Sequence, residues 1–334
     1  MTNPILVEVT RGGIVESVHH GAYCVVDAKD DVQLSAGKID VPVFPRSAIK
    51  AFQALPAVAS GVVDVFGFSD EEIALMCSSH SGEERHVAGS SSMLKKADFA
   101  ECDYECGAHW PYYQRRTNQM IAAGEKPSQL HNNCSGKHAG MLAFARQLDA
   151  ETAGYINPDH AVQREIAKTI GELCDYDLGN AARGVDGCSV PTWAVPLENL
   201  ALGFARFGTG EGLNEAKAKA AKRIIAAVRA HPFMVAGTGR FCTEIMEAIP
   251  RLFIKTGAEG VFCGCIPHAG LGFALKCEDG ATRASEIAAA NMLLKLDVWT
   301  VEEKAAFKNF MSRAIRNRRD IETGVIRGAD SAFG

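Results

Sequence analysis

The two ends of the chain carry short strand-like segments, whereas its middle is mostly amphipathic helix, and this order limits the possible folds more than any other feature. Three strands separated by "RGG" and "HG" turns are predicted near the N-terminus, at residues 5–11, 13–20 and 22–29. Three more follow Pro250, at residues 251–257, 260–267 and 271–277. If these terminal segments pair with one another, they form one antiparallel sheet covered by helices, which is an α+β fold.

Helical periodicity dominates the region between the two sets of strands. Ser69 is a predicted N-cap, because acidic residues follow it in the first turn of the next segment. Helices are predicted at residues 70–80, 135–148, 160–174 and 213–230, and two more at 283–296 and 301–315. We therefore expect a sheet region made of residues 1–60 and 230–334 and a mainly helical region of residues 61–229, together forming one compact unit.

The chain contains three S-x-x-K motifs, and one of them, Ser47/Lys50, lies where a catalytic serine–lysine pair could form. Ser35/Lys38 reads as a turn and Ser92/Lys95 as part of a solvated helix face, whereas Ser47/Lys50 follows a proline at an expected apolar helix start. Residues i and i+3 share a helix face, so a neutral lysine at that spacing could accept the proton of the serine hydroxyl. The alternative is a helix-capping serine beside an exposed lysine.

A second motif supports the catalytic interpretation. The Lys-Thr-Gly sequence at Lys255 lies on a late predicted strand, and this element accompanies S-x-x-K in serine β-lactamases and penicillin-binding proteins. A strand-edge lysine is the alternative for Lys255. The S-D-N element of those enzymes is missing, and "CSSHSGE" stands in its place with Ser78, Ser79 and His80 at an expected helix end. A serine there could relay a proton to Lys255, although helix-terminal serines more often bond to the backbone.

Composition excludes several classes of function. With 35 basic against 40 acidic residues, the chain has no broad basic surface for nucleic acid, so we expect a small-molecule partner. The N-terminus lacks a signal peptide pattern and no apolar run is long enough to span a bilayer, which predicts a cytoplasmic protein. Eleven cysteines, an odd number, then favour reduced thiols or a metal site over disulfides. Spacing alone predicts no metal site.

At this point the sequence resembles the rhizobial-type L-asparaginases. The resemblance runs through nearly the whole chain, in "RGGIVES", "FPRSAIKAFQALP", "CSSHSGE", "HNNCSGKHAGML", "DGCSVP", "GTGRFCTE" and "KTGAEGV". It implies a serine β-lactamase-like fold, a three-layer α/β/α sandwich. It also implies hydrolysis of L-asparagine to L-aspartate and ammonia, and a homodimer.

The resemblance also implies roles for individual residues. Ser47 with Lys50, and Ser79 with Lys255, would form two catalytic serine–lysine tandems. Arg46, His138 and Asp186 adjoin the two sites and become candidates for substrate binding, with Cys242 a weaker candidate. A zinc ion that orients the substrate or supports the structure would be held by Cys134, Lys137 and Cys188, and this set requires a deprotonated lysine.

Two other functions stay open. A penicillin-interacting serine hydrolase would use the same S-x-x-K and K-T-G order, but it is disfavoured by the missing S-D-N element and the missing export signal. A non-catalytic zinc or redox-sensing protein would use the cysteines, but it leaves the ordered serine and lysine motifs unexplained.

Overall fold

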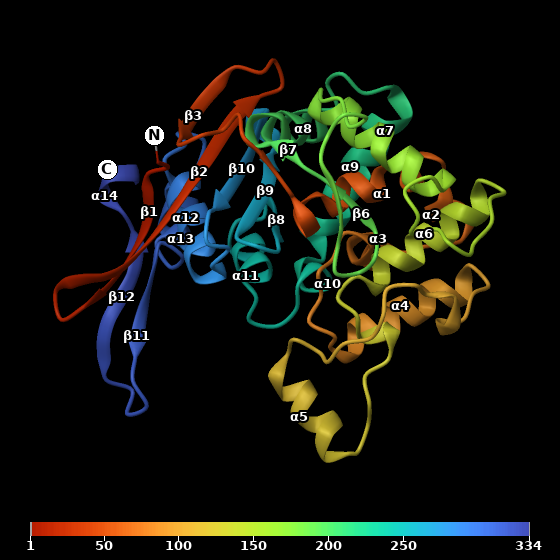
Figure 1. The fold of residues 1–334 in the computed structure, drawn as a ribbon, viewed down its shortest axis with the longest axis horizontal. Helices are drawn as coiled ribbons and strands as arrows, with labels where there is room; N and C mark the ends of the chain where they lie inside the picture. Colours follow the sequence, from red (N-terminus) through yellow and green to blue (C-terminus); the bar gives the residue numbers. More distant parts are fainter. Residues whose placement is uncertain (1, 334) are drawn as a thin grey trace.

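The computed structural model describes residues 2–333, and its central feature is an antiparallel sheet built from both ends of the chain (Figure 1). The strand order is β11-β12-β1-β2-β10-β9-β8, and β3 pairs with β2 beside this path. The strands are β1 (Ile5–Arg11), β2 (Ile14–Asp27), β3 (Val32–Ala36), β8 (Phe253–Gly257), β9 (Val261–Ile266), β10 (Leu271–Cys277), β11 (Ser312–Arg316) and β12 (Glu322–Gly328). Val7 pairs with Gly328 and Val25 with Phe273. The predicted pairing of the terminal segments is therefore confirmed, and the fold is α+β.

The predicted turn at "HG" is wrong, because β2 runs without interruption through Gly21. Its first half pairs with β1 and its second half with β10, so β2 joins the two halves of the sheet. A Cβ atom at Gly21 would lie 2.3 Å from the carbonyl oxygen of Lys276 and 2.7 Å from Leu6. Glycine stands here because another backbone approaches closely, and not because the chain turns.

Helices cover both faces of the sheet, which confirms the predicted three layers. Gly272 of β10 packs against α8 (Leu197–Thr209), where an added Cβ would lie 2.1 Å from the carbonyl oxygen of Ala201. Its cross-strand partner is Val26, so Val26 faces the same side. Tyr23 lies three residues away and therefore faces the other side. There it donates a hydrogen bond to the carbonyl of Ala332 in α14 (Asp330–Phe333) at 3.1 Å.

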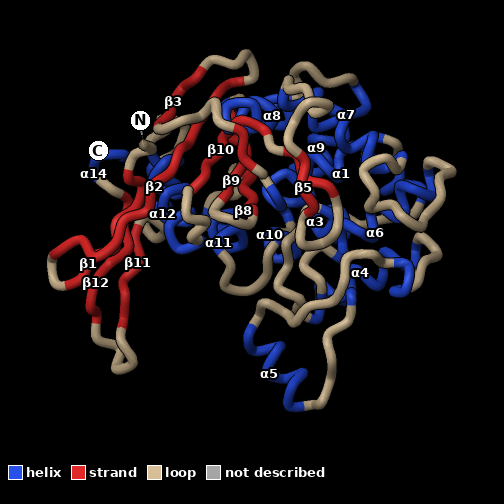
Figure 2. The backbone as a smooth tube through the Cα atoms, in the orientation of Figure 1, coloured by secondary structure: helices blue, strands red, loops and turns tan. Residues whose placement is uncertain are grey.

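The insert between the sheet segments is mainly helical (Figure 2). Its helices are α1 (Lys50–Ala59), α2 (Val62–Val65), α3 (Asp70–Met76), α4 (Glu84–Lys96), α5 (Gln114–Ala122), α6 (Ser135–Gln147), α7 (Ala161–Cys174), α8, α9 (Glu215–Ala230), α10 (Pro232–Val235) and α11 (Phe241–Ala248). Three short strands interrupt them, namely β5 (Arg183–Val185), β6 (Pro191–Trp193) and β7 (Val195–Pro196), and β7 pairs with β4 (Pro42–Val43). Ser69 caps α3 through a capping box with Glu72, as predicted. The division at residues 60 and 230 stays a prediction.

The helix predicted at residues 301–315 is correct only in its first half. After α12 (Thr282–Leu294), α13 (Val301–Phe307) ends early, and the chain continues as the edge strand β11. The helical pattern in residues 308–315 is overridden because Ala314 pairs with Val325 and the segment completes the sheet edge. Within residues 2–333, no helix is long and apolar enough to cross a membrane.

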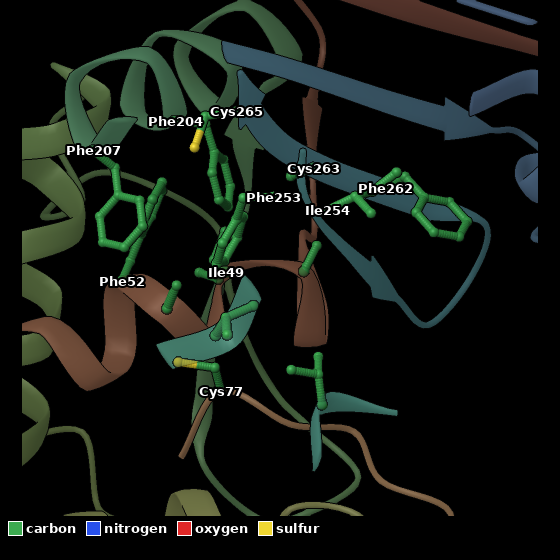
Figure 3. Close-up of a cluster of buried hydrophobic side chains, with 14 of the residues drawn as sticks. Ile49, Phe52, Cys77, Phe204, Phe207, Phe253, Ile254, Phe262, Cys263 and Cys265 are labelled. Carbon is green, nitrogen blue, oxygen red and sulfur yellow. The ribbon is translucent and has the colours of Figure 1, made fainter. Parts of the chain in front are cut away.

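An aromatic cluster fixes α1 against the sheet (Figure 3). The ring of Phe52 in α1 lies 4.3 Å from that of Phe204 and 5.6 Å from that of Phe207, both in α8. Phe253 of β8 joins the cluster at 5.8 Å from Phe207. Phe52 is two residues from Lys50 and Phe253 two residues from Lys255, so the cluster sets the distance between the elements that carry these lysines.

Candidate active site

Ser47 lies in a short 3-10 helix, Arg46–Ile49, that leads directly into α1. Arg46 has a φ of +52°, a left-handed conformation that costs free energy for a residue other than glycine. The K-T-G strand touches this turn, because a Cβ at Gly257 would lie 2.4 Å from the carbonyl oxygen of Pro45. The absence of a side chain at Gly257 thus allows β8 to approach the Ser47 turn.

Lys50 is buried and its ammonium contacts three acceptors. Its Nζ lies 3.0 Å from Ser79 Oγ and 3.1 Å from Cys134 Sγ, and it also donates to the carbonyl oxygen of Ser78. Three acceptors match the three N–H groups of an ammonium. Among residues 2–333, the Ser47 hydroxyl forms no hydrogen bond with Lys50, although the two residues are one helical turn apart.

Lys255 approaches Ser79 from β8. Its Nζ lies 2.8 Å from Ser79 Oγ and 2.8 Å from the carbonyl oxygen of Thr256. Burial, with the nearby Lys50 charge as the second cause, lowers the pKa of Lys255 from 10.5 to about 7. Lys255 can therefore be neutral near neutral pH and accept a proton from the Ser79 hydroxyl.

Ser79 is the point at which the two lysines meet. It follows the end of α3, and its backbone N–H donates to the carbonyl of Val235 at 2.9 Å. The predicted contact between Ser79 and Lys255 is present, while Lys50 also reaches Ser79. One hydroxyl between two buried amines is an arrangement suited to moving a proton.

Arg46 and Asp186 form an ion pair at the edge of this centre. Arg46 Nη2 and Nε lie 2.7 and 3.0 Å from the same carboxylate oxygen of Asp186. That oxygen also accepts the N–H of Gly187 at 2.6 Å. The second oxygen of Asp186 takes no part in these bonds, so the carboxylate keeps acceptor capacity.

The cysteines predicted as metal ligands gather beside Lys50. Lys137 Nζ lies 3.0 Å from Cys188 Sγ, and the Cys134 thiol donates to Asn133 Oδ1 at 2.9 Å. The proximity of Cys134, followed by the charge of Lys137, holds the pKa of Cys188 well below its usual range, although burial opposes this. Although burial opposes it, the charge of Cys188 raises the pKa of Lys137. The lowered pKa of Cys188 and the raised pKa of Lys137 both favour an ion pair between the two side chains.

His138 lies behind this thiol cluster and is fully buried. Its Nδ1 lies 2.7 Å from the hydroxyl of Tyr155, and its Nε2 has no hydrogen-bond partner among the described residues. Burial lowers the pKa of His138, so the imidazole is neutral. Tyr155 was not predicted, and no signal in the sequence marks it.

The donor chemistry of this cluster fits a zinc ion. Two thiols are soft ligands that suit zinc, and the amine of Lys137 could add a nitrogen ligand. Within residues 2–333, no group of three His, Cys, Asp or Glu side chains is arranged to hold a metal, so Lys137 would have to complete the set. Zinc could bind the amine of Lys137 only after Lys137 has lost a proton.

The fold thus places a buried centre, in which the amines of Lys50 and Lys255 both contact the Ser79 hydroxyl, beside a sheet that lies between helical layers. The L-asparaginase II family model matches residues 7–328, and the chain belongs to that family. No curated protein matches the chain.

Similarity to solved structures is low. The structure of Mglu is 14% identical over 79% of this chain, with a TM-score of 0.35, and the match spans 64% of Mglu. A β-lactamase from Mycobacterium bovis is 12% identical over 87% of this chain and 94% of its own, with a TM-score of 0.40. A putative β-lactamase from Bacteroides dorei is 12% identical over 82% of this chain and 93% of its own, also with a TM-score of 0.40. Similarity at this level carries no inference about activity.

Proposed function

We propose that this protein is an L-asparagine amidohydrolase that works by serine–lysine acyl transfer. Membership of the L-asparaginase II family supports the substrate. The observation that carries the proposal is the position of Ser79 Oγ, 3.0 Å from the amine of Lys50 and 2.8 Å from that of Lys255. Because Lys255 has a pKa of about 7, the centre can hold and return a proton near neutral pH.

Substrate recognition is assigned to the ion pair at the edge of the centre. The guanidinium of Arg46 would bind the α-carboxylate of asparagine, and the carboxylate of Asp186 would bind its α-ammonium. The charged groups of the substrate would thus replace the ion pair between Arg46 and Asp186. His138 is buried behind Cys188, and its contribution to substrate binding would therefore act through the thiol cluster.

Ser47 is the proposed nucleophile, and the two lysines with Ser79 are its proton relay. Lys50 gives a proton to Ser79 as Ser79 gives its own to Lys255, which leaves Lys50 neutral. Lys50 then accepts the proton of Ser47 as Ser47 Oγ bonds to the side-chain amide carbon. Lys50 then donates this proton to the departing nitrogen, and ammonia leaves as the C–N bond breaks. Water then hydrolyses the aspartyl ester through the same relay.

A zinc ion held by Cys134, Lys137 and Cys188 is part of the proposal. When bound, it would supply a fixed positive charge that orients neighbouring side chains and the substrate. Removal of the metal with a chelator should then change the KM or kcat for asparagine. Unchanged constants in metal-free protein would contradict this supporting role.

The first test is ammonia release from L-asparagine and from L-glutamine, each with and without zinc. Release from asparagine supports the proposed function, whereas folded, zinc-loaded protein that releases none would favour a zinc or redox-sensing protein. Covalent labelling by a fluorescent penicillin would instead favour the penicillin-interacting hydrolase. The homodimer and the cytoplasmic location stay predictions.

Mass spectrometry of an acid-quenched turnover mixture identifies the nucleophile. We expect the aspartyl ester on the peptide that contains Ser47, and none in Ser47→Ala. In Ser79→Ala the ester should form slowly at Ser47, because only the relay is lost. An ester on Ser79 would make Ser79 the nucleophile with Lys255 as its base, and would contradict the role of Ser47.

A further inference from the structure

His80 follows Ser79 in the same loop and contacts the loop that carries Cys134. The residue is fully buried. Its backbone N–H donates to the carbonyl of Asn133 at 3.2 Å, and its Nε2 lies 2.9 Å from Ser135 Oγ. Asn133 and Ser135 are the two residues that flank Cys134. A single side chain and its own backbone thus contact the thiol loop on both sides of the cysteine.

The hydrogen bonds around His80 determine which ring nitrogen carries the proton. Nδ1 accepts the N–H of Gly82 at 3.1 Å. Ser135 donates its own hydroxyl proton to the carbonyl of Leu130 at 3.0 Å, so it accepts from Nε2–H of His80. Burial keeps the ring neutral by lowering the pKa of His80 well below its usual range. Both ring nitrogens are therefore satisfied in one orientation.

These contacts belong to a continuous chain of contacts that begins and ends at Ser79 in the candidate active site. Ser79 precedes His80, and His80 holds the residues on each side of Cys134. Cys134 Sγ lies 3.1 Å from Lys50 Nζ, and Lys50 Nζ lies 3.0 Å from Ser79 Oγ. A shift of the thiol loop relative to Ser79 would therefore change the position of Lys50 between its acceptors.

We propose that His80 is a positioning residue that couples the thiol cluster to the Ser79 relay. It holds Cys134 at a fixed place relative to Ser79, so that ligand binding at the cluster and proton transfer at Ser79 depend on the same side chain. The inference rests on the proposed function for its kinetic part. Partners that orient ligands in this way typically change metal affinity or activity by about 10- to 100-fold when removed.

The test is a double-mutant cycle of His80→Ala and Ser135→Ala. Zinc affinity is measured by competition with a chelator, and kcat and KM are measured for asparagine. Each single variant should weaken zinc binding and lower kcat about 10- to 100-fold, with KM changed less than about threefold. Ser135→Ala also removes bonds to Ser90 Oγ and to the carbonyl of Leu130 and should therefore cost more than His80→Ala, but because both variants remove the bond between His80 and Ser135, the double variant should be little worse than Ser135→Ala. Additive effects, or zinc affinity and kcat close to wild type, would overturn the proposal.

His86 offers a matched control. Its ring stacks on that of His80 at 4.8 Å, and it is equally buried. Its Nδ1 accepts the N–H of Glu83 at 3.2 Å and its Nε2 lies 2.9 Å from the carbonyl of Phe233, so it makes similar bonds away from the thiol loop. His86→Ala should leave zinc affinity close to wild type. Equal losses in His86→Ala and His80→Ala would overturn the specific role of His80.

A conservative variant separates this role from a folding defect. The amide of His80→Gln can still donate to Ser135, so this variant should recover most of the zinc affinity and kcat lost in His80→Ala, and failure to recover them would contradict the proposal. The zinc measurement requires no turnover. A wild-type protein without asparagine hydrolysis would therefore overturn the proposed function, while zinc affinity would still decide the role of His80. Wild-type protein that binds no zinc would overturn the coupling.

Discussion

Lys255→Met should make the protein more stable than wild type below about pH 7 and less stable than wild type near pH 10.5. The folded protein lowers the pKa of Lys255 from 10.5 to about 7 by burial and by the charge of Lys50. Between these values the unfolded chain binds a proton that the folded chain does not, so wild-type stability rises with pH. At about 1.4 kcal/mol per pH unit, the cost of Lys255 below pH 7 is about 5 kcal/mol.

Methionine removes this cost but also the bonds of Lys255 to Ser79 and Thr256, each worth about 1 kcal/mol. The free energy of unfolding in urea is therefore measured for both proteins between pH 6.5 and 10. The stability advantage of Lys255→Met should fall by several kcal/mol over that range. Lys95→Met, at an exposed lysine of α4, controls for the loss of a charge. A stability difference that does not change with pH would refute the lowered pKa of Lys255.

Three further outcomes follow from the geometry. Gly257→Ala would place a Cβ 2.4 Å from the carbonyl oxygen of Pro45, so β8 would have to move away from the Ser47 turn. The kcat for asparagine should therefore fall about 100-fold. An unchanged kcat would contradict the close contact. Phe52→Ala should lower the free energy of unfolding by about 3–5 kcal/mol in urea because it leaves a cavity in the aromatic cluster, and a loss below about 1 kcal/mol would show that the cluster is not essential. In Arg46→Lys the ammonium cannot bind the α-carboxylate of asparagine through two N–H groups, so the KM for asparagine should rise about tenfold with kcat little changed. An equal fall in kcat would mean that Arg46 acts in the reaction itself.

The sequence predicted the sheet because its signals are local. Short apolar runs bounded by turn residues, around Val25 and Phe273, identify strands, and these two segments pair with each other. The predicted turn at Gly21 is wrong because the sequence does not distinguish a glycine required by a close backbone contact from a glycine in a turn. The helix predicted at Ala314 is wrong because edge-strand pairing with β12 outweighed a helical pattern that buries little.

The sequence named residues that meet in the structure, but it did not indicate which of these residues contact each other. Spacing placed Ser47 and Lys50 on one helix face, yet the amine of Lys50 extends to Ser79 and Cys134 from other loops. Such contacts depend on how loops far apart in the chain are packed, and no periodicity encodes them. For the same reason Tyr155, which bonds to His138, could not be found from the sequence.

The pairing of Val7 with Gly328 has a consequence for synthesis on the ribosome. β1 and β2 emerge first, but β10 is made about 240 residues later, which takes roughly 10 to 50 s at typical elongation rates. A two-stranded hairpin is barely stable in water. During that interval the newly made hairpin leaves strand edges without partners, and such edges are open to association with other chains. β10 and β12 close these edges once they have been made.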